Sequence, residues 1–593
     1  MKFRPRSAVR GSRRNVPGIP PAVIGPRIAE PQSLLLALDE DEAEKLNRPN
    51  AFLGPAQLRH RLGFPGNLIE ALQACRETES RPWKSGASES AHSRRSARYD
   101  LIVILLRSSL ETPVTLLTST DLPDLVHARH WVAGAANHSS PSAPRSVVNP
   151  ATGTTIGDFP AGNSDMIELA VLAAAEAAPA WWALGAKERR RVLTLAADRL
   201  AAAAPGLALL ESREMGKPVA MARQDIEDSI GLFRATADAA LDFFAPPADG
   251  AGYVAHRPYG VAALITPWNY PVCQVTDVLG GLLSAGNTVV VKPSEKAPLS
   301  VAALGPLLDI LPPGVVNIVL GDGEAGSALV ENTLVGLIHF TGSVATGRKV
   351  GAAAGGRLVP CFLELGGKDA LVINDDVDVD KAAERAADGG WINTGQVCTS
   401  IERVYVHRDV ADAFVSALVR QAALWPMGSG LDPAARMGPL VDARQRDFVH
   451  GQVTEAKLAG AEVPVGGEQD PGPGFFYPPT VVVGAPDDSR LMTEETFGPV
   501  IAVRVVNSFE EGIRLADTGD FGLTASVLTN DPAHRKLSAV LDAAIVTING
   551  GGDMPPDAPF EPARSSGLGR IHMGAQCLQS FTRPYVVCIG GPA

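Results

Sequence analysis

Gly260-Val261-Ala262-Ala263-Leu264-Ile265-Thr266, an unbroken apolar run, leads directly into Pro267-Trp268-Asn269-Tyr270-Pro271. A short apolar run that ends at a proline turn is typical of a strand buried on both faces of a parallel sheet. An asparagine at the carboxyl end of such a strand lies where open α/β sheets bind ligands, and its amide can donate to a developing oxyanion. Taken alone, an asparagine in this place is more often a turn residue.

Further β-branched runs follow at 288–291, 315–319 and 336–340, and Ala-rich helical segments alternate with them. Upstream, a turn signal at 148–153 is followed by helical spacing over 166–184 and 188–204. Strands that alternate with helices predict an α/β fold, with a parallel sheet covered by helices.

Polar motifs follow two of these predicted strands. The run at 288–291 continues into Lys292-Pro293-Ser294-Glu295, where a cation and a carboxylate three residues apart suit a phosphate and ribose hydroxyls; a solvated loop pair is the alternative. The run at 336–340 ends in Thr341-Gly342-Ser343, before a predicted helix. Glycine there lets backbone N–H groups approach a phosphate, although the stretch is not GxGxxG and is weak evidence by itself.

Two later stretches carry reactive groups. Glu364 ends an apolar strand beside Gly366-Gly367, and apolar surroundings would raise the pKa of its carboxyl toward the range of a general base, unless it simply faces solvent. Cys398 lies in the small-residue loop at 393–400, where a substrate can reach a thiol; a buried cysteine packed as a small hydrophobe is the alternative. Glu495 and Phe497 offer a carboxylate and an aromatic face.

Composition limits the classes of protein that fit. With 593 residues, 45% hydrophobic and 20% charged, the chain is long enough for two or three globular domains. The net charge of −12 comes from the residues after about 100, since the first hundred are basic, and an acidic body argues against nucleic-acid binding. We find no run of about 18 apolar residues that would cross a membrane. Six cysteines without a CxxC pair indicate no metal site and a reducing, cytoplasmic location.

The two ends of the chain carry little chemistry. Residues 1–127 are predicted to be an extension that is largely disordered or irregular, because they are rich in proline and arginine and show no sustained period. A transit peptide or an upstream start codon would give the same pattern. The apolar segment 585–589 is predicted to be a terminal strand that pairs with a hairpin near 243–256 or with another subunit.

Six motifs together resemble the aldehyde dehydrogenase superfamily. They are PWNYP (267–271), KPSE (292–295), FTGS (340–343), ELGGK (364–368), GQVCTS (395–400) and EETFGPV (494–500), in this order. The resemblance covers roughly residues 128–593. It implies a Rossmann-type NAD-binding domain (128–242 and 257–366), an α/β catalytic domain (367–574) and a small β oligomerisation flap (243–256 and 575–593).

The resemblance also implies roles for particular residues. Cys398 is similar to the family's nucleophile, Asn269 to its oxyanion donor and Glu364 to the base that activates the hydrolytic water. The cofactor positions are matched by Trp268, Lys292, Ser294, Glu295, Gly342, Ser343, Glu495 and Phe497. Because a carboxylate at Glu295 accepts ribose hydroxyls and repels a 2′-phosphate, we expect NAD as cofactor, with NADP possible.

The expected reaction follows from these residue types. Thiolate Cys398 attacks a small aldehyde, hydride leaves to the nicotinamide, and water activated by Glu364 hydrolyses the thioester to a carboxylic acid. The family implies a homodimer or homotetramer. The residues after Cys398 resemble members that act on succinate semialdehyde.

The sequence departs from the family pattern in two regions. In the stretch 559–571, Glu561-Pro562 replaces a glycine pair near the substrate mouth, and Ile571 stands where many members have glutamate. On the helix after Asn269, Asp277-Val278 occupies a place where many members carry an aromatic residue and a lysine. These departures leave open a catalytically altered or inactive scaffold; a variant that passes its thioester to coenzyme A is the other alternative.

Overall fold

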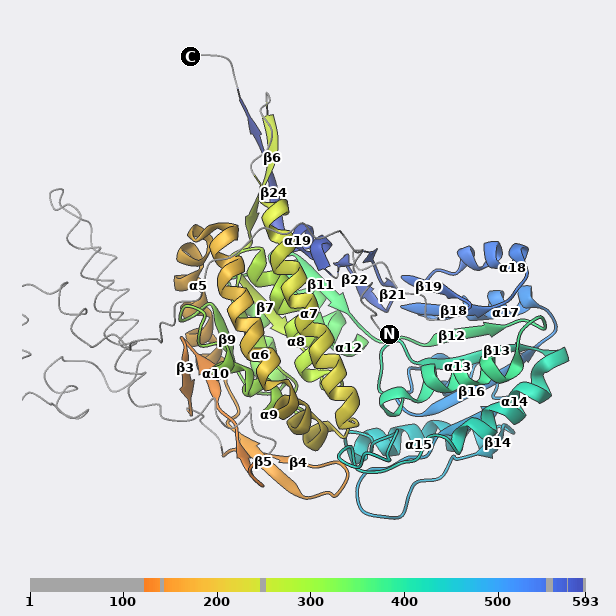
Figure 1. Ribbon diagram of the computed structural model, residues 1–593. Coiled ribbons are helices and arrows are strands. Elements are labelled where there is room, and N and C mark those ends of the chain that lie inside the picture. The colour runs from red at the N-terminus through yellow and green to blue at the C-terminus, as the bar shows by residue number, and fades with distance from the viewer. Residues whose placement is uncertain (1–121, 139–142, 246–251, 551–557, 573, 590–593) are drawn as a thin grey trace, which may run out of the picture. The chain divides into compact units, whose positions relative to one another are not determined.

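The computed structural model describes residues 122–138, 143–245, 252–550, 558–572 and 574–589 (Figure 1). Two large sheets organise them. In the first sheet five neighbouring strands are parallel, and short antiparallel strands extend it at both edges. Its order is β22 (Gly567–Leu568), β11 (Cys361–Glu364), β10 (Val335–Thr341), β7 (Val261–Ile265), β8 (Thr288–Lys292), β9 (Val316–Ile318), β2 (His130–Val132) and β3 (Ala135–Asn137).

The chain order of the first sheet reverses beside β7. The strands β8 and β9 continue on one side of β7, whereas β10 and β11 lie on its other side. Open α/β sheets bind ligands outside the carboxyl ends of the strands at such a switch point. The strand predicted at 260–266 is therefore central to the sheet, and all five residues of β7 are buried.

Long helices cover this sheet because their alanine and leucine residues form continuous apolar faces. They are α5 (Ser164–Ala183), α6 (Gly185–Met215), α7 (Val219–Phe243) and α8 (Pro271–Ser284). Figure 1 shows α6, α7 and α8 side by side. By length and composition α5 and α6 could cross a membrane, but 44% and 56% of their apolar windows are buried inside the protein, as in core helices.

The second sheet has seven strands, all parallel except β14 at one edge. Its order is β14 (Glu462–Val465), β15 (Thr480–Val483), β16 (Val500–Val506), β13 (Ile401–His407), β12 (Asp369–Ile373), β18 (Thr524–Leu528) and β19 (Ile545–Ile548). Two separate apolar clusters cover its faces. One includes α13 (Val379–Trp391) and α14 (Arg408–Ala422), and the other includes α15 (Ala443–Leu458) and α17 (Phe509–Ala516).

Smaller elements complete the described chain. A three-stranded sheet contains β1 (Val126–His127), β5 (Thr155–Phe159) and β4 (Arg145–Val148), and three two-stranded pairs follow. These pairs join β17 (Phe521–Gly522) to β21 (Ala563–Arg564), β20 (Pro559–Phe560) to β23 (Ile571–His572), and β24 (Thr582–Cys588) to β6 (Gly252–Pro258). The remaining helices and turns are α9 (Leu299–Ala302), α10 (Leu304–Leu307), α11 (Gly323–Glu331), α12 (Val344–Arg357), η3 (Ile392–Gly395), α16 (Arg490–Thr493), α18 (Pro532–Leu537), η4 (Ser538–Val540), η5 (Gly574–Gln576) and α19 (Cys577–Ser580).

The expected α/β class is confirmed, and the structure changes the predicted boundaries in three places. Strand β22 belongs to the first sheet although its residues fall in the predicted catalytic segment, because it pairs antiparallel with β11. Residue 243 ends α7 and so does not belong to the predicted hairpin segment 243–256. The predicted terminal strand 585–589 does pair with that segment, because β24 pairs antiparallel with β6. Strand β1 lies inside the predicted extension 1–127, of which residues 1–121 are outside the described residues.

Candidate active site

The loop that carries Cys398 has an unusual backbone. It follows α13 through η3, where Asn393, Thr394 and Gly395 have φ values of 49°, 60° and 68°. Left-handed conformations cost energy for residues other than glycine, and they persist where surrounding contacts hold them. Here the Asn393 Nδ2 donates to the carbonyl oxygens of Asn269 and Gln396, both at 3.2 Å. Cys398 is thereby held in a partly exposed loop.

The Asn269 side chain contacts this same loop. It follows β7, is 5% exposed, and its Nδ2 donates to the Gln396 carbonyl oxygen at 3.0 Å. A side-chain amide has two N–H donors, so one remains for another acceptor beside the loop. One residue, Val397, separates Gln396 from Cys398 in sequence. Asn269 and Cys398, predicted from separate motifs, thus belong to one site.

Glu364 and Cys398 act on each other electrostatically. Burial raises the pKa of the Glu364 carboxyl to about 7, and the Cys398 thiol opposes this shift. Burial and then the Glu364 carboxylate raise the pKa of the Cys398 thiol well above its ordinary value. Glu364 Oε2 is enclosed and has no hydrogen-bond partner among the described residues. The site therefore joins a protonated thiol to a carboxyl that changes charge near neutral pH.

A second group of predicted residues lies at the ends of β8 and β10. Lys292 Nζ donates to the Gly321 carbonyl oxygen at 2.9 Å and lies 3.9 Å from Glu295 Oε2. Burial lowers the pKa of Lys292, whereas the Glu295 side chain is 44% exposed. Ser294 is mostly buried, and its Oγ accepts from the Lys296 backbone N–H at 3.3 Å.

Gly342 and Ser343 lie between β10 and α12. The Ser343 hydroxyl caps α12 by accepting from the Thr346 N–H at 3.4 Å. The other N–H groups of the first helical turn have no partners within the helix, and such a terminus attracts anions. A carboxylate for ribose hydroxyls and a helix N-terminus for a pyrophosphate suit a dinucleotide, so these residues fit NAD.

Glu495 and Phe497 lie between the two groups. Glu495 Oε1 accepts from the Gly367 N–H at 3.0 Å, and burial followed by the nearby Glu402 charge raises its pKa to about 8. A Cβ on Gly366 would lie 2.4 Å from Glu495 Oε2, which explains the glycine. The Phe497 ring contacts the Trp268 ring edge-on at 5.5 Å between centroids.

Two functional neighbours were not singled out from the sequence. Lys368 and Glu402 are both 2% exposed and form an ion pair with 2.5 Å between Nζ and Oε2. Glu402 also accepts from the backbone N–H groups of Thr496 and Phe497, each at 2.8 Å. The pair fixes the loop that presents Glu495. A glutamate and an arginine, Glu402-Arg403, at the start of a strand that continues with apolar residues are the sequence signal that could have found it.

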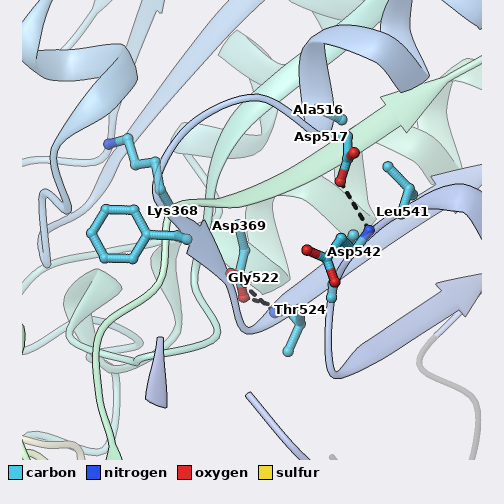
Figure 2. A pocket seen from close by; sticks show the side chains of 11 residues that line it. Lys368, Asp369, Ala516, Asp517, Gly522, Thr524, Leu541 and Asp542 are labelled. Atoms are coloured by element: carbon cyan, nitrogen blue, oxygen red, sulfur yellow. Dashed lines mark hydrogen bonds between the residues drawn. The ribbon is translucent and has the colours of Figure 1, made fainter. Parts of the chain in front are cut away.

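A small polar pocket adjoins this pair on the second sheet (Figure 2). Asp369, buried beside the Lys368 backbone, accepts from the Thr524 backbone N–H at 3.2 Å and from its hydroxyl. The Lys368 ammonium points away from this pocket in Figure 2. Burial raises the pKa of Asp369 to about 8. A Cβ on Gly367 would lie 2.5 Å from the Cys398 carbonyl oxygen and 2.7 Å from Asp369 Oδ1, so Asp369 of this pocket lies close to the Cys398 loop.

The chain is similar to known proteins over most of its length. The sequence model described as "Aldehyde dehydrogenase family" matches residues 137–587. A betaine aldehyde dehydrogenase of Cereibacter sphaeroides is 36% identical over 481 residues, which cover 78% of this chain and 98% of that protein. The peroxisomal aminoaldehyde dehydrogenase 2 of Pisum sativum is 36% identical over 459 residues, which cover 74% and 90%. The NAD+ complex of an aldehyde dehydrogenase from Bacillus cereus has a TM-score of 0.75 at 32% identity, and the match covers 78% of this chain and 96% of that one.

Proposed function

The chain belongs to the aldehyde dehydrogenase family, and on that premise we propose that Cys398, Asn269 and Glu364 carry out the oxidation of an aldehyde to a carboxylic acid. The enzyme is an NAD(P)-dependent aldehyde dehydrogenase. One observation supports the assignment of residues above others. The Asn269 amide donates a hydrogen bond to the loop that carries Cys398, and the Cys398 thiol lowers the pKa of the Glu364 carboxyl.

The thiol of Cys398 is the nucleophile. Because its pKa is raised, it needs a neighbouring base, and Glu364 is the carboxylate that acts on it most strongly. Attack on the aldehyde carbon places negative charge on the carbonyl oxygen. The unused N–H of the Asn269 amide and the Cys398 backbone N–H stabilise this oxyanion.

Glu364 passes the thiol proton to solvent and, ionised again, accepts a proton from the water that hydrolyses the thioester on Cys398. A carboxyl whose pKa is about 7 is half ionised near neutral pH, which suits a general base. The chemistry that NAD supplies when bound is acceptance of a hydride. Lys292 and Glu295 would hold its adenosine ribose, Gly342 and Ser343 its phosphates, and Glu495 and Phe497 its nicotinamide end.

The three residues act on the aldehyde group of the substrate, and they do not specify the chemical group at its other end. Relatives named for betaine aldehyde and aminoaldehydes make a nitrogen-containing aldehyde one candidate. The small semialdehyde expected from the residues after Cys398 is the other.

Replacing Asn269 by alanine tests the proposal most directly. We expect turnover to fall about 100-fold or more, because one oxyanion donor is lost. Absorbance at 340 nm with a panel of aldehydes, and with NAD and NADP in parallel, measures the rate. Turnover of Asn269→Ala at the wild-type rate would contradict the assignment.

A further inference from the structure

Helix α8 presents a partly exposed stripe that begins at the catalytic asparagine. Asn269 and Tyr270 lead into its first turn, and Cys273, Asp277 and Val278 are partly exposed, whereas Val272, Val275 and Leu279 are buried. Residues spaced by three and four lie on one face of a helix. The stripe therefore runs from the reacting groups toward Asp277, about 10 Å along the helix axis from Tyr270.

Tyr270 connects this stripe to the reacting thiol. Burial and then the Asp225 charge raise the pKa of the Tyr270 hydroxyl well above the usual value, and the charges of Cys398 and Cys273 act in the same direction. Cys273 in turn donates its thiol proton to Asp277 Oδ2 at 3.3 Å. Tyr270, Cys273 and Asp277 thus lie along the part of the chain that starts beside Asn269, whose amide bonds the Cys398 loop.

Asp277 has fewer partners than a carboxylate needs. A thiol is a weak donor, and Asp277 Oδ1 is enclosed without any hydrogen-bond partner among the residues that the structure describes. The charged groups that act on it are two further carboxylates, Asp225 and Asp228 of α7. Asp225 is paired with Lys217 at 3.0 Å, and Asp228 accepts from Gln224 at 2.9 Å. Asp277 is the member of this group that the fold leaves without a strong donor.

A carboxylate held among carboxylates destabilises the fold, and such groups are concentrated at functional sites. The surroundings of Asp277 also determine which charged group of a ligand would bind there. An anionic substrate end would meet the Asp277 carboxylate, on which the Asp225 and Asp228 charges also act, whereas a primary ammonium offers three N–H donors and a positive charge. A quaternary ammonium offers the charge without a donor, so it leaves the Oδ1 atom unsatisfied.

We infer that Asp277 is a specificity-determining residue that binds the primary ammonium group of an ω-aminoaldehyde whose carbonyl lies at Cys398. This inference rests on the proposed function and names the substrate class of the same site. Asp277 takes no part in the covalent steps. It places the far end of the substrate, and it disfavours the semialdehyde named from the sequence.

Four aldehydes of equal chain length test the inference. They end in an ammonium, a trimethylammonium, a methyl and a carboxylate group, and kcat/KM is measured for each with the wild-type enzyme and with Asp277→Asn. For the wild type we expect the ammonium substrate to be best and the carboxylate worst. In Asp277→Asn we expect kcat/KM for the ammonium substrate to fall about 10- to 100-fold, because a charge-assisted hydrogen bond is lost. The methyl-ended substrate should change little.

Two further variants serve as controls. Asp277→Glu keeps the carboxylate and should retain the preference for ammonium. Asp228→Asn removes the same charge from the neighbouring helix without touching Asp277, and its effect should be several-fold smaller. An equal loss for the ammonium and methyl substrates in Asp277→Asn, or an equal effect of Asp228→Asn, would overturn the inference while leaving aldehyde oxidation intact.

A measurement without turnover separates this inference from the proposed function. Alkylation of Cys398 by iodoacetamide, followed by mass spectrometry, is compared in the presence of n-butylammonium and of n-butanol. We expect the amine to protect Cys398 in the wild type and not in Asp277→Asn. Equal protection in both proteins contradicts the role of Asp277, whereas loss of 340 nm activity with every aldehyde contradicts the proposed function instead.

Discussion

The buried Glu364 carboxyl has an oxygen without a hydrogen-bond donor, whereas buried carboxylates usually accept hydrogen bonds through both oxygens. It is 9% exposed, and its Oε2 has no partner within the described ranges. Burial alone accounts for most of the upward shift of its pKa to about 7, since the Cys398 thiol acts in the opposite direction. Glu364 in turn raises the pKa of the thiol, so below about pH 7 the resting site holds both protons. Loss of the Glu364 proton therefore sets the pH above which the enzyme is active.

Replacing Glu364 by glutamine keeps the shape of the side chain and removes the base. We expect turnover to fall about 100- to 10,000-fold, the range that general bases contribute. The wild-type rate should rise with pH through about 7, because only the ionised carboxyl accepts a proton, and this rise should be absent in Glu364→Gln. Rates followed at 340 nm across pH measure both effects.

Nucleotide affinity provides the control for this variant. Quenching of the fluorescence of Trp268 and the other tryptophans on NAD addition should be the same in Glu364→Gln and in the wild type. A variant that keeps the pH midpoint of the wild type would assign the base to another residue.

At the scale of the elements, the carboxyl ends of one sheet meet the amino ends of the other. Ile265 of β7 pairs with Phe340 of β10, and Thr341 of β10 pairs with Glu364, so the strand ends of the first sheet are in register. Cys398 precedes β13 and Glu495 precedes β16 in the second sheet. The Cys398 loop is the element between them, and its left-handed Gly395 lies against the Gly498 backbone, so this loop has no room for added volume there.

Gly395→Ala tests how tightly this loop is packed. Gly395 has a φ of 68°, and a Cβ there would lie 2.1 Å from the Gly498 carbonyl oxygen. We expect a loss of about 1–3 kcal/mol of stability, together with loss of activity, because the backbone of either loop must move. Thermal unfolding and the rate at 340 nm measure the two effects.

Gly451→Ala is the matched control. Gly451 lies inside α15, and an added Cβ meets nothing within 4 Å, so the same substitution should stabilise that helix by roughly 0.5–1 kcal/mol. Normal activity and stability in Gly395→Ala would show that the loop tolerates a shift in the position of Cys398.

The sequence predicts the strand ends and fails at the contacts between the two sheets. The apolar run before Asn269 and the one before Lys292 identify β7 and β8 because buried parallel strands have no polar alternation. The bond from Asn269 to Gln396 spans 127 residues, and the one from Glu402 to Thr496 spans 94. No local pattern specifies such contacts, so only the family resemblance placed Asn269 beside Cys398. Glu402 matches no motif role and was missed.

At the scale of the whole molecule, several buried carboxyl groups have a raised pKa and keep their protons to a higher pH than exposed carboxyls do. Burial raises the pKa to about 8 for Glu214, Asp369 and Glu495, and to about 7 for Asp277 and Glu364. Three of these acids adjoin the Cys398 loop, and Asp277 lies on the stripe that leads away from it. Their common cause is burial of the carboxyl group, which is the largest effect on each of them. The free-energy cost of burying these carboxyl groups depends on pH, because burial disfavours only their ionised form.

Stability should therefore fall as the solution becomes alkaline. Between the ordinary carboxyl pKa of 4.5 and the raised values of about 7 to 8, the folded chain binds more protons than the unfolded chain. The free energy of unfolding then decreases with rising pH, and the decrease ends once the pH exceeds the raised values. The midpoint of thermal unfolding, measured at a fixed scan rate, should be higher near pH 6 than near pH 8.5. Glu364→Gln removes one such proton and should flatten this dependence, whereas an unchanged slope would mean that Glu364 is already ionised in the folded enzyme at pH 6.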